Sequence, residues 1–245
     1  MRAGVEGQNQ RYYDLEASVY DSNRYASVQG RRVAAFHIAV LDRLLTRDLS
    51  AGASVLEVGC GTGRLLEALS SRGYRLHGID TSEGMLAVAR ERLAQRDSVV
   101  ELQTGDATRL PFQDGSFDAA YSILVVNLIP NYKDMFREVA RILRPGGLFV
   151  FNVPNLASVY ALGGLYVNIR GQTVGSNAAG HRHSHWFRPG EWRSALEECD
   201  FSVDEVLGQP PHLRFVDNVV PLRAMGPQLL LSKSVYIKAR RKHER

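Results

Sequence analysis

The chain has 245 residues, 44% of them hydrophobic, and its 30 Lys and Arg against 26 Asp and Glu give a formal net charge of +4. This length and apolar content predict one large α/β domain with a buried core rather than two small domains. The two cysteines, Cys60 and Cys199, lie far apart, which argues against a disulfide framework or a zinc knuckle and fits a reducing cytoplasm.

Residues 1–50 predict N-terminal helices. Residues 31–48 place apolar side chains at three- and four-residue steps, the pattern of an amphipathic helix. The first residues lack the apolar core of a signal peptide, and the longest apolar runs of the chain, SILVVNLI and LFVF, are too short to cross a bilayer. We therefore expect a cytoplasmic protein without a transmembrane segment.

Residues 51–154 alternate between strand and helix patterns. The predicted strands are SVLEVG, YRLHGID, VVELQTGD, FDAAYSILVV and LFVFNVP, and the helices between them are RLLEALSSRG, SEGMLAVARERLAQR and YKDMFREVARIL. Strands separated by helices pair in parallel through right-handed crossovers. With two later strands, FSVDEVLG and SVYIKAR, the pattern predicts a doubly wound, mostly parallel, Rossmann-like sheet of seven strands with helices on both faces.

The last third is less regular. Residues 155–188 form a connection far longer than usual, which predicts a cap inserted after the fifth strand. Residues 189–245 then supply a C-terminal helix, EWRSALEEC, and the two last strands. The basic tail KARRKHER is more typical of a solvated end than of a nucleic-acid contact, because aromatic residues do not accompany it. We treat the whole chain, residues 1–245, as a single domain.

The stretch VLEVGCGTG joins a buried strand to a glycine-rich loop and a helix, which is the layout of a nucleotide cradle. A phosphate-binding P-loop would end in Gly-Lys-Ser or Gly-Lys-Thr, which is missing. A dinucleotide loop would carry glycine at the sixth position from Gly59, where Arg64 stands. The loop therefore disfavours NAD, FAD and a nicotinamide oxidoreductase.

Five segments in order over residues 53–152 resemble the class I S-adenosylmethionine-dependent methyltransferases. They are Glu57-Val-Gly59-Cys60-Gly61-Thr-Gly63, the HGID that ends in Asp80, Gly105-Asp106-Ala107, FDAAYSILVVNLIPN and RILRPGGLFVF. In layout the chain is similar to the methyltransferases of ubiquinone and menaquinone biosynthesis and of natural products. The resemblance implies S-adenosyl-L-methionine as the cofactor and a small molecule as the substrate.

The resemblance also implies roles for single residues. The glycine loop would wind beneath the amino-acid half of the cofactor, Asp80 would bind both ribose hydroxyls, and Asp106 and the Ala107 N–H would contact adenine. The remaining cofactor candidates are Thr81, Met85 on the adenine ring, Ser122 at the transfer site, and Tyr20 and Arg24 over the methionine carboxylate, with Tyr12 and Tyr13 behind them. Several of these residues also have a purely structural interpretation. The glycines could serve a tight turn, Asp80 a helix cap, and Asp106 a turn, and Met85 and the tyrosines could simply pack in the protein. Asp118 is expected to be structural.

Methyl transfer needs mainly alignment of acceptor, methyl group and sulfur, although an oxygen or nitrogen acceptor can require a base. The base candidates are His181 and His185 in the segment HRHSH, and Asn127 stands where the family usually has a histidine. Solvated loop histidines and a metal arrangement that includes His183 are the alternatives, and without an acid cluster we expect no metal.

The walls of the substrate pocket are expected to be aromatic, which predicts a partly apolar or aromatic acceptor. The aromatic candidates are Tyr160, Tyr166, Trp186, Phe187 and Phe215. The fourth-strand region has SILVVNLIP in place of Asn-Pro-Pro-Tyr, which disfavours an adenine-N6 or glutamine methyltransferase. The alternative function is a pseudo-enzyme that binds S-adenosylmethionine as a partner subunit without turnover. The sequence leaves the oligomeric state open.

Overall fold

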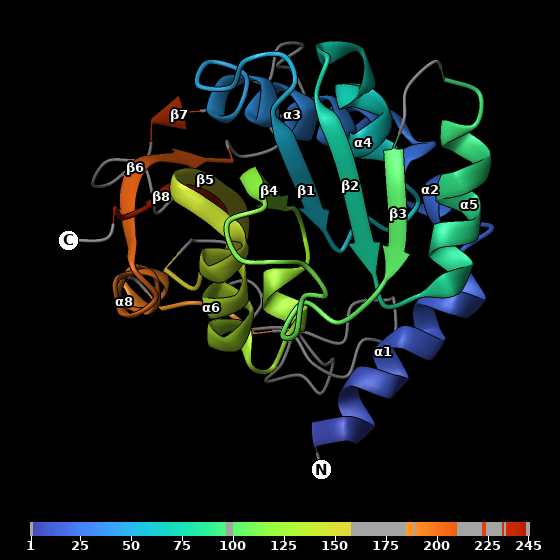
Figure 1. The fold of residues 1–245 in the computed structure, drawn as a ribbon. Coiled ribbons are helices and arrows are strands. Elements are labelled where there is room, and N and C mark those ends of the chain that lie inside the picture. Colours follow the sequence, from blue (N-terminus) through green and yellow to red (C-terminus); the bar gives the residue numbers. More distant parts are fainter. Residues whose placement is uncertain are drawn as a thin grey trace.

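The structure, a computed structural model, describes residues 2–96, 100–157, 185–188, 190–209, 222–223, 232 and 234–243, with side chains from residue 7 on except at 222–223. Its centre is one twisted sheet with strand order β3-β2-β1-β4-β5-β8-β6-β7 (Figure 1). The strands are β1 (Ser54–Val58), β2 (Arg75–Asp80), β3 (Val100–Thr104), β4 (Phe117–Ser122), β5 (Leu143–Pro154), β6 (Phe201–Gly208), β7 (Leu222–Arg223) and β8 (Ser234–Arg241).

The first five strands pair in parallel. β1 lies at the centre of this half, between β2 and β4, and all five of its residues are buried. Such burial on both faces is typical of parallel sheets covered by helices on both sides. The crossover helices between these strands are α4 (Arg64–Leu69), α5 (Glu83–Leu93) and α6 (Tyr132–Ile142), and short 3-10 turns η1 (Ser70–Arg72) and η2 (Val126–Leu128) follow α4 and β4.

The remaining strands pair antiparallel, and β8 enters between β5 and β6. The two-residue strand β7 extends the far edge by pairing with β6. The predicted seven-stranded Rossmann-like sheet is therefore confirmed in its seven long strands, and β7 is an addition that the sequence did not predict. Helix α8 (Glu191–Glu198) precedes β6, as expected.

Alternating residues of the strands build two separate apolar layers. On β1, Val55 packs with the helices of one face, among them α3 (Val28–Leu44), whereas Leu56 packs with α6 and α8 on the other. The buried face of α6 carries Met135, Phe136, Val139 and Ile142, the spacing of one helix side. The prediction of helices on both faces is thus confirmed.

Two further helices, α1 (Arg2–Glu16) and α2 (Tyr20–Tyr25), precede α3. Figure 1 shows α1 lying beside the start of α5, below the carboxyl ends of β2 and β3. Helices α2 and α3 meet so closely that a Cβ added to Gly30 would lie 2.3 Å from the backbone oxygen of Arg24. Among the described residues, no helix is long and apolar enough to span a membrane.

Strand β4 ends earlier than the run FDAAYSILVV predicts. Leu124 has a φ of 66°, a left-handed conformation that is uncommon for a residue other than glycine. Its N–H donates to the side-chain oxygen of Asn152 on β5 at 2.6 Å, which holds the chain in this turn. The residues after Ser122 therefore leave the sheet and become available to line a site.

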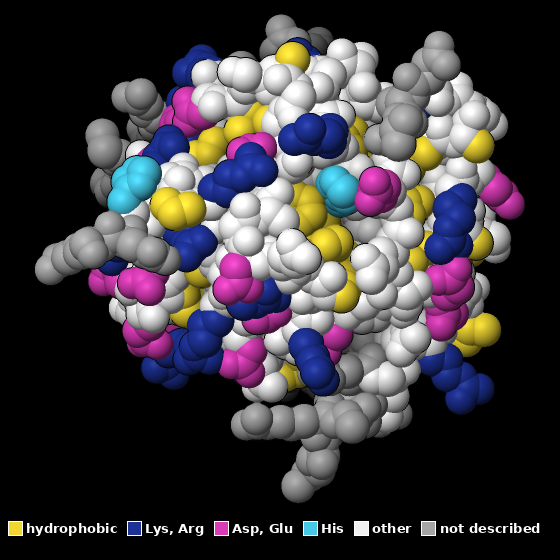
Figure 2. Space-filling model, in the orientation of Figure 1, with side chains coloured by type: hydrophobic (Ala, Val, Ile, Leu, Met, Phe, Trp, Pro, Cys, Tyr) yellow, Lys and Arg dark blue, Asp and Glu magenta, His cyan; other side chains and the backbone are white. Residues whose placement is uncertain are grey.

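The surface drawn in Figure 2 mixes both signs of charge. Dark blue Lys and Arg side chains lie among magenta Asp and Glu side chains, with small apolar patches between them. Elsewhere in the described residues, charges also occur in short ion pairs, such as Arg96 with Glu67 at 2.6 Å and Lys133 with Glu198 at 2.7 Å. The described residues on this face thus do not form one continuous basic surface of the kind that binds a phosphate backbone.

Candidate functional site

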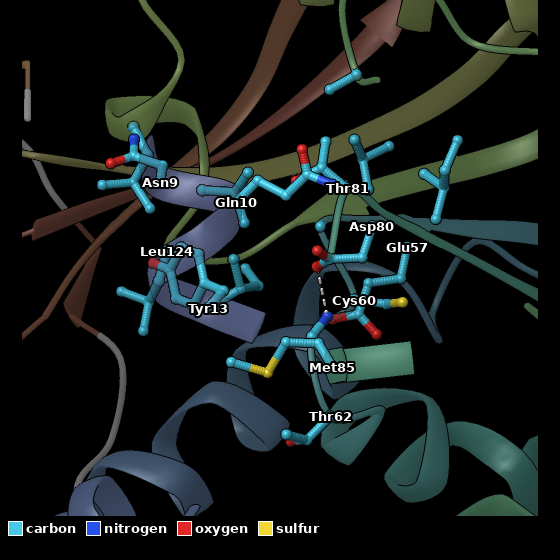
Figure 3. Close-up of a pocket in the computed structure, with 18 of the residues that line it drawn as sticks. Asn9, Gln10, Tyr13, Glu57, Cys60, Thr62, Asp80, Thr81, Met85 and Leu124 are labelled. Carbon is cyan, nitrogen blue, oxygen red and sulfur yellow. Dashed lines mark hydrogen bonds between the residues drawn. The ribbon is translucent and has the colours of Figure 1, made fainter. Parts of the chain in front are cut away.

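A cavity of about 490 Å³ opens at the carboxyl ends of β1 to β4, where the loops after parallel strands form the usual binding crevice of this architecture. Its walls are the glycine loop, the turn after Asp80, residues 105–107, residues 123–130, and the facing sides of α1 and α2. Figure 3 shows side chains of these elements pointing toward a common space. The volume is typical of a site for one small ligand.

Two glycines of the loop have different roles: one allows close packing, and the other borders the open cavity. Gly59 and Gly61 have φ values of 75° and 52°, which other residues rarely adopt. A Cβ on Gly59 would lie 2.5 Å from Val125 Cγ2, so this glycine lets residues 123–130 approach the loop. A Cβ on Gly61 would meet no atom within 4 Å, because Gly61 borders the cavity. The loop therefore leaves room for a ligand against its backbone.

Asp80 joins two loops at the floor of the cavity. Its Oδ2 accepts from Gly61 N–H at 2.8 Å and its Oδ1 accepts from Ser82 N–H at 2.9 Å (Figure 3). Loss of solvation raises the pKa of Asp80, and these N–H donors offset the rise only in part. The cap of α5 is Ser82, whose Oγ accepts from Met85 N–H at 3.1 Å, so Asp80 is not the helix cap. Each oxygen can accept a second hydrogen bond from a ligand.

Asp106 lies on the cavity wall after β3. Its Oδ1 accepts from the N–H of Thr108 at 2.7 Å and from its hydroxyl at 2.9 Å, which is a turn-stabilising arrangement. Its Oδ2 has no protein partner among the described residues. Asp106 can thus stabilise the turn and bind a ligand at the same time, because each role uses a different carboxylate oxygen.

The structure brings ten of the predicted cofactor residues together around the cavity. They are Tyr20, Glu57, Gly59, Cys60, Gly61, Asp80, Thr81, Met85, Asp106 and Ala107. Gly63, Ser122 and Arg24 do not line it. Gly63 lets α4 approach Ala89 on α5, Ser122 Oγ donates to Val58 O at 2.9 Å between two strands, and Arg24 lies 4.6 Å from the centre of the Tyr20 ring.

Two of the three base candidates, His185 and Asn127, can be placed relative to the cavity. His181 falls outside the described residues. His185 and Asn127 meet through their backbones, since His185 N–H donates to Asn127 O at 2.7 Å, but neither side chain lines the cavity. The His185 Nε2 lies 2.5 Å from Glu191 Oε1, and its ring stacks on Tyr132 at 5.5 Å between centres.

Glu191 binds this imidazole together with two other donors. Tyr132 OH donates to Glu191 Oε1 at 3.0 Å, and Arg188 N–H donates to Oε2 at 3.0 Å. Burial acts to raise the pKa of Glu191, but the hydrogen bonds from Arg188, His185 and Tyr132 outweigh it and hold that pKa below its ordinary value. An ionised Glu191 therefore anchors residues 185–188, the end of the predicted cap segment, to α8.

The wall after β4 is apolar, as expected for the acceptor side, but its residues differ from the predicted ones. It consists of Ile123, Leu124, Val125, Leu128, Ile129 and Pro130. Phe187, expected in this wall, is instead 1% exposed and packs against Tyr132 in the core. Trp186 does not line the cavity either, and Tyr160, Tyr166 and Phe215 lie outside the described residues. The described wall after β4 is therefore aliphatic. The aromatic rings that line the cavity come from α1 and α2 instead.

Sequence reasoning missed the contribution of α1. Asn9 and Gln10 line the cavity beside Tyr13, which the sequence named only as a secondary candidate (Figure 3). The helix is held over the site by Asp14, whose Oδ1 accepts from Ser82 Oγ at 2.5 Å and from Gly84 N–H at 3.1 Å. Only the tyrosine pair beside Asp14 in an otherwise polar helix signalled this surface.

Comparison with known proteins agrees with this geometry. The family model described as "Methyltransferase domain" matches residues 56–151. The demethylmenaquinone methyltransferase of Tropheryma whipplei (strain Twist) is 33% identical over 165 residues, 62% of this chain and 68% of that protein. The demethylmenaquinone methyltransferase of Shouchella clausii is 32% identical over 155 residues, 60% of this chain and 63% of that protein. The match thus spans about two thirds of the length of these relatives.

Among solved structures, a Thermotoga maritima S-adenosylmethionine-dependent methyltransferase, described as a possible histamine N-methyltransferase, superposes with a TM-score of 0.70. It is 20% identical, and the match covers 95% of this chain and 99% of that one, which shows a shared fold. Together with the sequence relatives and the cavity at the strand ends, these matches identify the family. The chain belongs to the class I S-adenosylmethionine-dependent methyltransferases.

Proposed function

We propose that this protein transfers the methyl group of S-adenosylmethionine to a small, partly apolar or aromatic metabolite. The observation that carries the proposal is the convergence of Gly61, Asp80 and Asp106 on one cavity, each with a backbone or oxygen open to it. These groups match a nucleoside with a ribose diol and an exocyclic amine. The proposal extends the family assignment to the activity and substrate class of this chain.

The residues around the cavity fit the cofactor. Asp80 offers two carboxylate oxygens to the ribose hydroxyls, and Asp106 Oδ2 with the Ala107 N–H would pair with the edge of the adenine ring. Met85, 1% exposed, packs beside this place as an apolar platform. When bound, the cofactor supplies an electrophilic methyl group on a sulfonium sulfur.

The rest of the cavity suits an acceptor of low polarity. Leu124, Ile129 and Pro130 face the space beyond the loop, and Tyr13 and Tyr20 close it from the side of α1 and α2. Because positive charge disperses in a methyl transfer from sulfonium, a dry pocket that aligns the acceptor supports the reaction without a dedicated nucleophile. An acceptor with an apolar or aromatic body would be held by this wall.

Calorimetric titration of the pure protein with S-adenosylmethionine, S-adenosylhomocysteine and NAD tests the cofactor. We expect binding of both sulfur compounds and no response to NAD. Incubation with methyl-labelled S-adenosylmethionine and a broad metabolite extract then tests turnover, and label should enter a small organic-soluble product. NAD binding alone would refute the proposal, and cofactor binding without any labelled product would favour the pseudo-enzyme.

A catalytic role for His185 is a separate prediction. If its imidazole removes a proton from the acceptor, His185→Gln should lower kcat by about 100-fold or more while leaving the affinity for S-adenosylhomocysteine unchanged. Glu191→Gln should shift the pH profile of kcat in that case, because it alters the carboxylate bound to His185. An unchanged kcat in both variants would assign His185 to anchoring the end of the cap segment to α8. The same assay on His181→Gln tests the other candidate.

A further inference from the structure

Among the described residues, one cationic side chain lines the cavity. Arg64, the first residue of α4, is the only Lys or Arg among the described residues that line it, whereas Asp21, Glu57, Asp80 and Asp106 supply four carboxyl groups. Arg64 has no ion-pair partner in the described part of the chain. The sequence singled out Arg64 only because it breaks the dinucleotide spacing, and the structure places it on the wall of the site.

The guanidinium of Arg64 is held by neutral groups. One terminal nitrogen, Nη2, lies 3.3 Å from His37 Nδ1, Nη1 lies 3.4 Å from Ala34 O, and the group stacks 4.4 Å from the centre of the Tyr25 ring. A guanidinium only donates hydrogen bonds, so His37 Nδ1 must be the acceptor and the imidazole must be neutral. His37 is 1% exposed, and burial with the nearby Arg64 charge lowers its pKa to about 3. These contacts orient Arg64 without neutralising it.

The carboxyl groups nearby do not neutralise Arg64 either. Asp21 accepts from Thr62 Oγ1 at 3.0 Å and pairs with Arg92, and Asp80 accepts from two backbone N–H groups. Glu57 is 3% exposed and accepts from Tyr121 OH at 3.0 Å. Burial raises the pKa of Glu57 to about 8 despite the opposing charge of Arg64, so near neutral pH Glu57 is mostly uncharged. An uncompensated positive charge therefore remains at the cavity wall.

We propose that Arg64 binds the carboxylate of the cofactor's amino-acid half and that the buried His37 positions its guanidinium. The inference rests on the proposed function, since it takes S-adenosylmethionine as the ligand. Of the described groups that face the cavity, Arg64 is the one whose charge and free N–H donors complement a carboxylate. Arg24, the candidate implied by the family resemblance, lies over Tyr20 and does not line the cavity.

Two ligands that differ by one carboxyl group test this assignment. We would titrate the wild type and Arg64→Gln with S-adenosylhomocysteine and with S-adenosyl-3-thiopropylamine, which is the same molecule without its carboxyl group. The wild type should prefer S-adenosylhomocysteine. Arg64→Gln should lose about 10- to 100-fold in affinity for it and almost none for the decarboxylated ligand, as expected for a hydrogen-bonded charge pair. Arg72→Gln, which removes an arginine outside the cavity, is the matched control and should keep the wild-type preference.

The ratio of the two affinities separates recognition from folding, because both ligands require the same adenosine site. His37→Leu removes the acceptor of Arg64 and should reduce the ratio, whereas His37→Gln keeps an oxygen acceptor and should restore much of it. Arg64→Lys should retain part of the preference as a point charge without the guanidinium fork.

Several results would overturn the assignment. An unchanged ratio in Arg64→Gln, or equal losses for both ligands, would show that Arg64 does not bind the carboxylate. A collapse of the ratio in Arg24→Gln with Arg64→Gln unaffected would assign this role to Arg24. If the folded wild type bound neither ligand, the proposed function itself would be wrong, which is distinct from a failure confined to the Arg64 variants.

Discussion

Glu57 is an almost fully buried carboxyl group at the edge of the cavity. It lies on β1 directly before the glycine loop, is 3% exposed, and accepts a hydrogen bond from Tyr121 OH. Burial raises its pKa from 4.5 to about 8. Between these two pH values the folded protein keeps a proton that the unfolded chain has lost, so the free energy of unfolding falls as pH rises through this window.

Replacing Glu57 by Gln, which mimics the protonated acid, should remove this pH dependence. Near pH 5 the variant should be about as stable as the wild type. At pH 9 it should be more stable by at least about 1 kcal/mol, since one unit of pKa shift corresponds to about 1.4 kcal/mol. Urea denaturation at both pH values measures the difference, with Glu91→Gln on the exposed side of α5 as the control. A variant less stable than the wild type at pH 9 would contradict the expected protonation.

Asp80→Ala should weaken binding of S-adenosylhomocysteine by about 1 to 3 kcal/mol, because it removes charge-assisted hydrogen bonds to the ribose. The same change frees the N–H groups of Gly61 and Ser82, so some of the loss reflects a loosened loop. Asp80→Asn separates the two effects, because it keeps an oxygen acceptor and removes the charge. Calorimetry on both variants gives the affinities, and wild-type affinity in Asp80→Ala would exclude a ligand contact.

At the scale of residues, the sequence located the groups whose neighbours are close along the chain. Gly59, Gly61 and Asp80 stand at strand ends that hydrophobic periodicity defines, so their convergence follows from a parallel sheet. Asn9 and Gln10 were missed because their place depends on how a polar helix docks. Arg64 was recognised only as a break in spacing, since its ligand-facing position requires the partner His37, 27 residues away along the chain.

At the scale of elements, helix α1 serves as one wall of the site although its own sequence is polar. Its attachment depends on Asp14, which accepts from Ser82 Oγ and from Gly84 N–H at the start of α5. Helix α2 is tied in the same way, because Asp21 pairs with Arg92 on α5 and accepts from Thr62 in the glycine loop. Both N-terminal helices are thus bonded to the loops that form the floor of the cavity.

Asp14→Ala should loosen α1 by about 1 kcal/mol, the usual cost of losing a side-chain acceptor at a helix start. Hydrogen exchange of residues 2–16 should become faster, and the affinity for S-adenosylhomocysteine should fall several-fold because Tyr13 and Gln10 leave the wall more often. Arg11→Ala, on the exposed side of the same helix, should change neither quantity. Unchanged exchange in Asp14→Ala would show that other contacts hold α1.

Element types were predictable where a strong period was present, and boundaries were less so. The helices at residues 83–93 and 132–142 and the strands at 54–58 and 201–208 agree with the sequence within a few residues. The strand predicted to continue past Ser122 stops there instead, because Asn152 on β5 captures the N–H of Leu124. Apolar character alone cannot reveal such a turn, since it comes from a hydrogen bond between residues 28 positions apart.

At the scale of the whole molecule, the alternation of strands and helices predicted the parallel pairing of β1 to β5, because right-handed crossovers through helices join parallel strands. The order of the strands was not predicted in either half of the sheet. Pairing between β5 and β8 joins residues more than 80 positions apart, such as Phe151 with Ile237. No local pattern carries that information.

Deleting residues 232–245 should abolish folding rather than trim the molecule. β8 is almost entirely buried and separates β5 from β6, so its loss exposes two strand edges and removes the buried side chains Val235, Tyr236 and Ile237 from the two apolar layers. Circular dichroism and size-exclusion chromatography should show a loss of cooperative unfolding and aggregation. A truncated chain that remained monomeric and bound S-adenosylhomocysteine would show that β1 to β5 are self-sufficient.

The position of β8 between β5 and β6 also affects the order in which the chain can fold during synthesis. β6 is synthesised before β8, although β8 is its principal partner in the sheet. Until β8 is in place, β6 and the facing edge of β5 stay unpaired. During that interval the chain exposes unpaired strand edges that can pair with other chains. Aggregation through these edges therefore competes with folding until β8 pairs with both β5 and β6.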